Sequence, residues 1–234
     1  MEPQWRMLLF AFAGRIRWRY RMGAMIGDWE AYNDPVNSVH RAGQMAPVWL
    51  EAAQVSGMPV DPGIWLDPAD RPASSLPACL AVKAAELQSA AAGSAYLRRL
   101  REAVMTERRN IARHAVLVEL AEECAATSPA KLDAGRLSRD LVSCAVRSAL
   151  HEDVVEAHRL GISRFPALAV RGTAQPTGVV LVGWRPFDAL AEVVRHAAPE
   201  IGPVRRPVSR DEYGSFWPGS TERELSDAGP PSDP

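Results

Sequence analysis

The sequence predicts an α/β protein in which a long block of helices separates two parts of a small core. Three observations support this fold class. A helix and a period-two strand open the chain, helical periodicity fills about 38–158, and two short aliphatic runs near 166–182 are spaced as an antiparallel hairpin. With 234 residues, 47% of them hydrophobic, the chain is long enough to bury a core without disulfides.

The first predicted elements are a helix and a strand. A stripe at helical spacing is formed by Trp5, Leu8, Leu9 and Phe12. Residues 15–22 then alternate, with apolar side chains on one face and four arginines on the other, which predicts a strand with one buried face. We interpret the arginine face as solvated, because the chain as a whole is not basic. Its members are Arg15, Arg17, Arg19 and Arg21.

The middle of the chain is rich in alanine and helical in pattern. The predicted helices are 38–56, 76–91, 93–108, 111–126, 133–141 and 144–159. Pro47 should kink or interrupt the first of them, because proline removes a helical hydrogen bond. The segment Gly57–Pro77, rich in proline, glycine and aspartate, predicts a loop.

The last elements are a hairpin and a helix. Strands are predicted at 166–171 and 178–182, joined by a turn over 172–177, and a helix follows at 186–196. From Pro199 onward the chain holds seven of its 19 prolines and shows no sustained periodicity. This composition predicts a disordered or loosely docked tail at 201–234.

Composition excludes several classes of function. Lysine and arginine number 27 against 28 acidic residues, a net charge of −1, which argues against nucleic acid or a membrane surface as partner. No apolar run reaches the ~18–20 residues of a transmembrane helix. The run Met7–Ala13 resembles a secretory leader, but it is too short and follows Glu2. We therefore expect a cytoplasmic protein.

The cysteines and histidines suggest no site of their own. Three cysteines without a Cys-x-x-Cys predict neither a disulfide framework nor a zinc site. Cys79, near a helix start, is a candidate thiolate but is better interpreted as a small buried hydrophobe, and Cys124 and Cys144 as structural. Histidines and carboxylates also cluster on one predicted helix, and we interpret them as a solvated helix face rather than a metal site. The cluster comprises His151, Glu152, Asp153, Glu156 and His158. We expect no metal, no cofactor and no catalytic residue in the chain as printed.

Several segments resemble the DsbA family. Gly161–Leu168 resembles its cis-proline segment, and Glu2–Trp5 with Ile16–Ile26 resembles the helix and strand that follow its redox motif. The stretch from Gly43 to Lys83 resembles the insertion of the cytosolic branch. The resemblance implies a bacterial protein with a thioredoxin-like fold, a large helical insertion and the first β-strand absent.

The resemblance also divides the chain and places a site. It implies a first core part at 1–36, a helical insertion at 37–160, a second core part at 161–200 and the tail at 201–234. The substrate-binding residues that it implies are Arg164, Phe165 and Pro166, with a cis peptide before the proline that sequence alone would make trans. It implies an adjacent groove lined by Met22–Ile26.

The sequence departs from the family at the redox motif. In the family a Cys-x-x-Cys precedes the Glu-Pro that is Glu2–Pro3 here, and its first thiolate is stabilised by the helix N-terminus. Either Met1 is an internal methionine mistaken for the start, or the protein has lost redox activity and keeps a binding surface. We expect the first, because a missing strand would leave the ladder groups of 15–22 unpaired.

Three functions remain open, and with them whether the protein is an enzyme. The first is a DsbA-type oxidoreductase, in which one thiolate attacks a protein or small-molecule disulfide and the second cysteine resolves the mixed disulfide. The second is a redox-silent adaptor with a protein partner, as in cytosolic relatives that deliver a regulator to a protease. The third is a glutathione-dependent isomerase or transferase of the kappa-like branch. The residues upstream of Met1 would discriminate between them.

Overall fold

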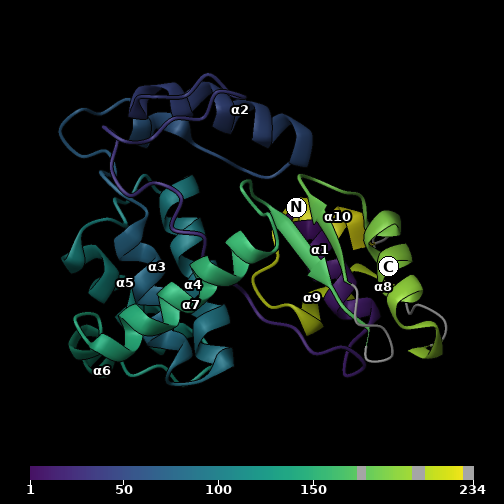
Figure 1. The fold of residues 1–234 in the computed structure, drawn as a ribbon. Helices are drawn as coiled ribbons and strands as arrows, with labels where there is room; N and C mark the ends of the chain where they lie inside the picture. The colour runs from purple at the N-terminus through teal and green to yellow at the C-terminus, as the bar shows by residue number, and fades with distance from the viewer. Residues whose placement is uncertain (173–177, 202–208, 229–234) are drawn as a thin grey trace. The chain divides into compact units, whose positions relative to one another are not determined.

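The computed structural model describes residues 1–172, 178–201 and 209–228, which form two compact units (Figure 1). Unit 1 comprises 1–18, 56–58 and the described residues from 159 onward, and unit 2 comprises 19–55 and 59–158. Each unit has its own hydrophobic core.

Unit 1 contains a hairpin and four helices longer than a single turn. Its elements are α1 (Glu2–Ala11), β1 (Ala167–Val170), β2 (Val179–Val182), α8 (Phe187–Ala197), the short 3₁₀ helix η3 (Pro199–Ile201), α9 (Arg210–Phe216) and α10 (Glu222–Ala228). Helix α1 packs against α8 and α10, and α8 packs against β1. The predicted hairpin and final helix are therefore present, while most of the predicted turn, 173–177, lies outside the described residues.

The C-terminal segment differs from the predicted tail. Residues 209–228 form α9 and α10, and Tyr213 of α9 packs with Met7 and Phe10 of α1. A buried ion pair of 2.8 Å joins Arg6 to Glu224 of α10. Both helices have seven residues, which is too short for helical periodicity to appear in the sequence. The parts of the predicted tail at 202–208 and 229–234 lie outside the described residues.

The predicted strand at 15–22 is absent. This segment has no regular secondary structure, because the described strands β1 and β2 pair with each other and neither pairs with it. Its arginine face is not simply solvated either. Arg19 bonds to Glu156, and Arg21 bonds to both Asp153 and Glu156.

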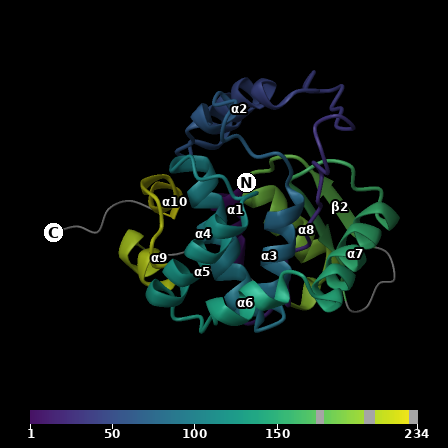
Figure 2. The same cartoon turned by 90° about the vertical axis from the view of Figure 1, so that its left-hand side faces the viewer.

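Unit 2 is helical. In chain order its elements are η1 (Ala42–Gln44), α2 (Met45–Ser56), η2 (Pro62–Trp65), α3 (Leu76–Glu86), α4 (Ala90–Thr106), α5 (His114–Thr127), α6 (Ala134–Asp140) and α7 (Cys144–Arg159), where η1 and η2 are 3₁₀ helices. Helices α3, α4 and α5 lie side by side (Figure 2). All six predicted helices are present, but the first begins only at Met45, so that Pro47 stands in its first turn, where proline is tolerated.

Small side chains let these helices approach closely. Ala81, Ala84 and Ala85 of α3 and Ala103 of α4 are fully buried. Tyr96 of α4 is also fully buried, and its hydroxyl donates a 2.6 Å hydrogen bond to the Leu117 carbonyl of α5. The core is therefore closed by packing and by an internal hydrogen bond.

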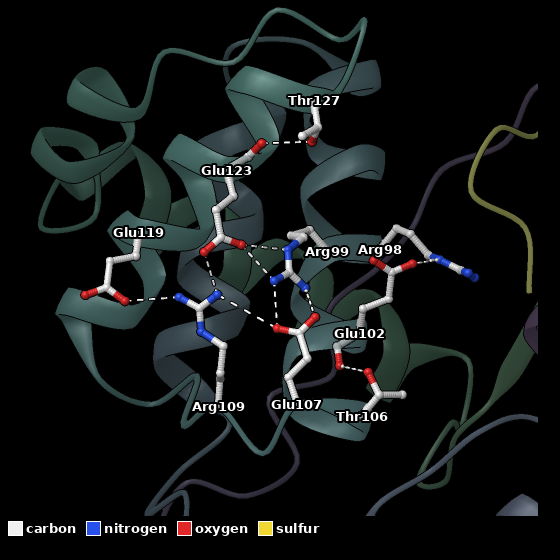
Figure 3. A network of polar contacts seen from close by, with 9 residues as sticks. All are labelled: Arg98, Arg99, Glu102, Thr106, Glu107, Arg109, Glu119, Glu123 and Thr127. Carbon is white, nitrogen blue, oxygen red and sulfur yellow. Dashed lines mark hydrogen bonds and ion pairs between the residues drawn. The ribbon is translucent and has the colours of Figure 1, made fainter.

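An ionic network ties α4 to α5 on the surface of unit 2 (Figure 3). Arg99 of α4 donates hydrogen bonds of 2.7 Å to both Glu107 and Glu123. Arg109 donates to Glu123 at 2.6 Å and to Glu119 at 3.0 Å. The two arginines thus share the Glu123 carboxylate, which fixes their side chains together. We interpret this network as structural.

Among the described residues, no helix is long and apolar enough to cross a membrane.

Candidate polypeptide-binding site

The loop that joins α7 to β1 carries the three predicted substrate-binding residues. Gly161, with φ of +67°, follows α7 closely, and its left-handed backbone is typical of a residue just past a helix end. Residues 163–166 are exposed, and the Phe165–Pro166 peptide is cis, as the resemblance implied. Phe165 exposes 41% of its surface. The loop therefore presents an arginine, an aromatic ring and a proline to solvent.

The hairpin ladder extends into this loop. Ala167 pairs with Val182 and Val170 pairs with Val179, and the Gly183 N–H donates a 2.8 Å hydrogen bond to the Pro166 carbonyl just beyond the strands. Because hydrogen-bonded and non-bonded pairs alternate in an antiparallel ladder, the backbone groups of Pro166, Leu168 and Val170 face β2.

The same alternation leaves an open edge on β1. The backbone N–H and C=O groups of Ala167 and Ala169 point away from β2. In the described part of the chain, no group hydrogen-bonds to them, and β1 has no strand on that side. Arg164–Phe165–Pro166 lies directly before β1 in the chain.

Sequence reasoning missed Trp184 and Arg185 at the same end of the hairpin. Trp184 follows Gly183 and exposes 37% of its surface, and Arg185 is exposed beside it. Gly183, with φ of +84°, turns the chain out of the ladder at this point. The available signal was the Gly-Trp-Arg that ends the aliphatic run of β2.

The three cysteines lie in unit 2, whereas the loop belongs to unit 1. None of the three is paired in a disulfide. Burial raises the pKa of Cys79, and the Asp153 charge adds to this effect, while a hydrogen bond from the Ala24 N–H only partly offsets it. Burial likewise raises the pKa of Cys124. Cys144 is exposed at the start of α7, with a guanidinium nitrogen of Arg147 3.9 Å from its sulfur.

The acidic face of α7 is not the solvated surface that we expected. Asp153 is fully buried, and its Oδ2 accepts from the Met22 N–H at 3.0 Å and lies 2.9 Å from Lys83 Nζ. The partners come from distant parts of the sequence and neutralise the carboxylate. His151 and His158 are exposed, and the described residues contain no group of three metal-ligating side chains. The Asp153 cluster therefore anchors the segment around Met22.

The groove expected at Met22–Ile26 remains a prediction. Met22 is buried in the helical core, and Met25 is exposed. Both residues belong to unit 2, whereas Phe165 belongs to unit 1.

Comparisons with known proteins agree with this architecture. The thioredoxin family model matches residues 1–192. The ClpXP adapter protein SpxH of Halalkalibacterium halodurans is 25% identical over 194 residues, which are 82% of this chain and 61% of that protein. SpxH of Bacillus subtilis is 32% identical over 161 residues, which are 68% of this chain and 52% of that protein. The chain thus spans between half and two thirds of the length of these relatives.

A solved structure shows the same fold. The cytosolic disulfide reductase DsbM from Pseudomonas aeruginosa aligns with a TM-score of 0.57, over 92% of this chain and 90% of its own, at 21% identity. The predicted fold class, thioredoxin-like with a helical insertion, is confirmed.

Proposed function

We propose, from the premise that this chain belongs to the thioredoxin family, that it binds an extended polypeptide along the exposed loop Arg164–Phe165–Pro166. The proposed role of this binding is to present a protein substrate for thiol–disulfide exchange of the DsbA type. The observation that carries the proposal is the exposed loop 163–166 directly before β1, in which Phe165 exposes 41% of its surface.

Binding and redox chemistry are separable in this chain. The raised pKa of Cys79 keeps its thiol protonated at neutral pH, and the protonated form is a poor nucleophile. We therefore expect the chain as printed to bind unfolded polypeptide without reducing insulin disulfides. Measurable insulin reduction with Cys79 intact would contradict this expectation.

The binding step can be tested with a polypeptide that has no reactive thiol. We suggest fluorescein-labelled insulin B chain with carboxymethylated cysteines, and fluorescence anisotropy as the readout. Phe165→Ala should weaken binding about tenfold, because it removes the exposed ring at the centre of the loop. Phe216→Ala, a matched control on α9 with similar exposure, should bind like the wild type. Absence of binding, or an unchanged Kd for Phe165→Ala, would refute the proposal.

An adaptor role is the second candidate, and the names of the relatives favour it. The two SpxH proteins are named ClpXP adapters, and binding a polypeptide at the 164–166 loop would serve delivery as well as exchange. The discriminating measurement is the rate at which ClpXP degrades a polypeptide that the chain binds. An adaptor would raise this rate, and Phe165→Ala would remove the increase. An unchanged rate would favour the oxidoreductase role.

We also propose that the protein acts in the bacterial cytoplasm. The curated relatives described above are bacterial, and the similar solved structure is named cytosolic. Expression with a compartment-specific tag in a bacterial host would test this proposal.

A further inference from the structure

Four aromatic rings of unit 2 form a continuous row. The ring centroids of Tyr32 and Trp29 lie 5.3 Å apart, those of Trp29 and Trp65 5.8 Å, and those of Trp65 and Trp49 5.2 Å, and each pair is arranged edge to face. Trp65 ends η2, Trp49 lies in α2, and the other two precede η1. Trp65 is buried and the other three are partly buried. The aromatic row therefore joins three separate segments of unit 2 into one surface that is partly open to solvent.

Exposed aliphatic side chains stand beside the aromatic row. Leu66 directly follows Trp65 and exposes 65% of its surface, and Leu50 directly follows Trp49 and exposes 48%. Removing such side chains from water is favourable. The two leucines therefore offer a partner apolar area that the described residues leave uncovered.

Carboxylates, and not cations, flank the aromatic row in the sequence. An acidic residue stands within two positions of every ring, and no lysine or arginine does. Over residues 28–71, seven acidic residues stand against two arginines, although the whole chain is nearly neutral. Because successive Cα atoms are about 3.8 Å apart, acidic residues two positions away remain close to the rings. The four that are exposed are Asp28, Glu30, Glu51 and Asp67.

These four carboxylates are not neutralised within the part of the chain that the structure describes. None of them forms an ion pair there, and Asp28 and Asp67 accept only from backbone N–H groups of their own turns. Arg108, which reaches the start of η2, is already paired with Asp61. A lysine or arginine of a ligand can contact a ring face and a carboxylate together, so this arrangement complements a cationic ligand.

We propose that this surface of unit 2 binds a basic amphipathic helix of a partner protein. The apolar face of the helix contacts the aromatic row and the two leucines, and its lysines or arginines meet the four carboxylates. Every residue of unit 2 is described and none belongs to a β-strand, so this unit offers no strand for backbone pairing. A bound segment that satisfies its own backbone hydrogen bonds, as a helix does, is therefore favoured. The 164–166 loop belongs to unit 1, so the inference does not rest on the proposed function.

Three fluorescently labelled peptides of equal length, all without cysteine, test this proposal on the full chain. The first is a leucine–lysine helix with one apolar face, and the second has glutamate in place of each lysine. The third has the composition of the first in an order that forms no apolar face. Fluorescence anisotropy should show the first peptide binding about tenfold more tightly than either of the others. Added salt should weaken its binding.

A surface variant tests the apolar part of the proposal. Leu66→Ser should weaken binding of the leucine–lysine helix about fivefold, because it removes an exposed apolar contact without disturbing the core. The matched control is Val142→Ser, since Val142 is an aliphatic residue of unit 2 that exposes 70% of its surface. It should bind like the wild type, and both variants should keep the circular dichroism spectrum of the wild type.

A double variant tests the charges. Glu51→Gln with Asp67→Asn should reduce the preference for the lysine helix over the glutamate helix about fivefold. Glu122→Gln with Glu152→Gln, which changes two exposed carboxylates on α5 and α7, is the control and should keep the preference.

Three results would overturn the inference. The first is equal binding of the lysine and glutamate helices, and the second is a Kd that neither Leu66→Ser nor the double variant changes. The third is self-association of the chain that Leu66→Ser abolishes, without binding of the basic helix, which would make a second copy of the chain the occupant. The loop of unit 1 is tested separately with the carboxymethylated B chain and Phe165→Ala, so each of these results leaves the proposed function standing.

Discussion

The helical core of unit 2 and the hairpin of unit 1 differ in how deeply they bury their apolar side chains. In α3 and α4, small and apolar residues are fully buried. Even the charged Asp153 of α7 is fully buried and is paired with Lys83. In β1 and β2, all eight residues are aliphatic and none is fully buried. The arginines beside the hairpin, Arg164 and Arg185, have no carboxylate partner among the described residues.

The contrast teaches that apolar sequence alone does not decide burial. Helices satisfy their own backbone groups, so unit 2 needs only side-chain packing to close. A two-stranded sheet leaves two edges unpaired, and a hairpin of this size is marginal without a further layer or strand. We therefore interpret unit 2 as closed by its own side-chain packing, whereas the hairpin of unit 1 keeps unpaired strand edges among the described residues.

The largest expected effect comes from breaking the interior of unit 2 at Asp153. Asp153→Ala should lower the free energy of unfolding by about 4 kcal/mol, because it removes one of the two carboxylate partners of the buried Lys83, the partner of Arg21 and the acceptor of the Met22 N–H. Urea denaturation followed by circular dichroism measures the loss.

The control for this change lies one residue away. Glu152 is exposed on the same helix, so Glu152→Ala should change the stability by no more than about 0.5 kcal/mol. A loss of similar size for both variants would show that the helix, and not the buried charge, is responsible. The paired interior of unit 2 would then no longer differ in kind from the partly exposed hairpin of unit 1.

The second effect concerns unit 1, which also contains a closed part. Glu224 is fully buried, pairs with Arg6 and accepts from the Thr221 N–H at 2.7 Å. Glu224→Ala should cost about 3 kcal/mol and release α10 first, since it removes both the ion pair and the helix cap. Hydrogen exchange should therefore accelerate in α9 and α10 before the hairpin.

A matched change tests whether Glu224 is special. Glu222 lies in the same helix, is exposed and pairs at the surface with Arg210. Glu222→Ala should leave hydrogen exchange in α9 and α10 almost unchanged. Equal acceleration in both variants would mean that the segment is weakly held, as the sequence had suggested.

A third, smaller effect isolates one hydrogen bond in the core of unit 2. Tyr96→Phe should cost about 1 kcal/mol, because it removes the hydroxyl that bonds to the Leu117 carbonyl and leaves the ring in place. Tyr32→Phe is the control, since no hydrogen bond of the Tyr32 hydroxyl is found among the described residues. Equal values of the urea midpoint for the two variants would contradict the prediction.

The sequence predicted what local pattern controls. The helices of unit 2 were found because alanine-rich periodicity persists over many turns, and the hairpin because its aliphatic runs are short and separated by turn residues. The prediction of a strand at 15–22 was wrong. Alternation of apolar and polar residues shows only that one face is apolar, whereas a strand also needs a hydrogen-bonded neighbouring strand. Arg19 and Arg21 instead bond to Asp153 and Glu156, which lie more than a hundred residues away in the sequence.

The C-terminal helices carried a signal that periodicity could not detect. Ser209 caps α9 three residues before Glu212, and Thr221 and Glu224 form a reciprocal capping box at α10. Such Ser/Thr-x-x-Glu pairs mark helix starts even where the helix is short. Some residues of the candidate site could likewise be identified from the sequence, and others could not. Arg164, Phe165 and Pro166 followed from the family resemblance, whereas the exposure of Trp184 just beyond β2 is visible only in the structure.

The smallest predicted effect lies on the surface of unit 2, in the network of Figure 3, and it depends on pH. Burial alone would raise the pKa of Glu123, but hydrogen bonds from Arg109 and Arg99 outweigh it and lower the pKa. A carboxyl with a lowered folded pKa stabilises the protein above its ordinary pKa, and the contribution is lost as the pH falls through the folded value. Glu123→Gln should therefore cost less than about 1 kcal/mol at neutral pH.

The shape of the pH dependence identifies the cause. The stability difference between wild type and Glu123→Gln should shrink as the pH falls below the ordinary range of a glutamate and as salt is added, because both weaken the same ion pairs. Glu122→Gln, at an exposed neighbour with no ion pair in the described chain, should show no such trend. A difference that stayed constant across pH would assign the effect of Glu123 to helix propensity. The ionic surface of unit 2 would then add nothing to the packing that already sets it apart from the hairpin.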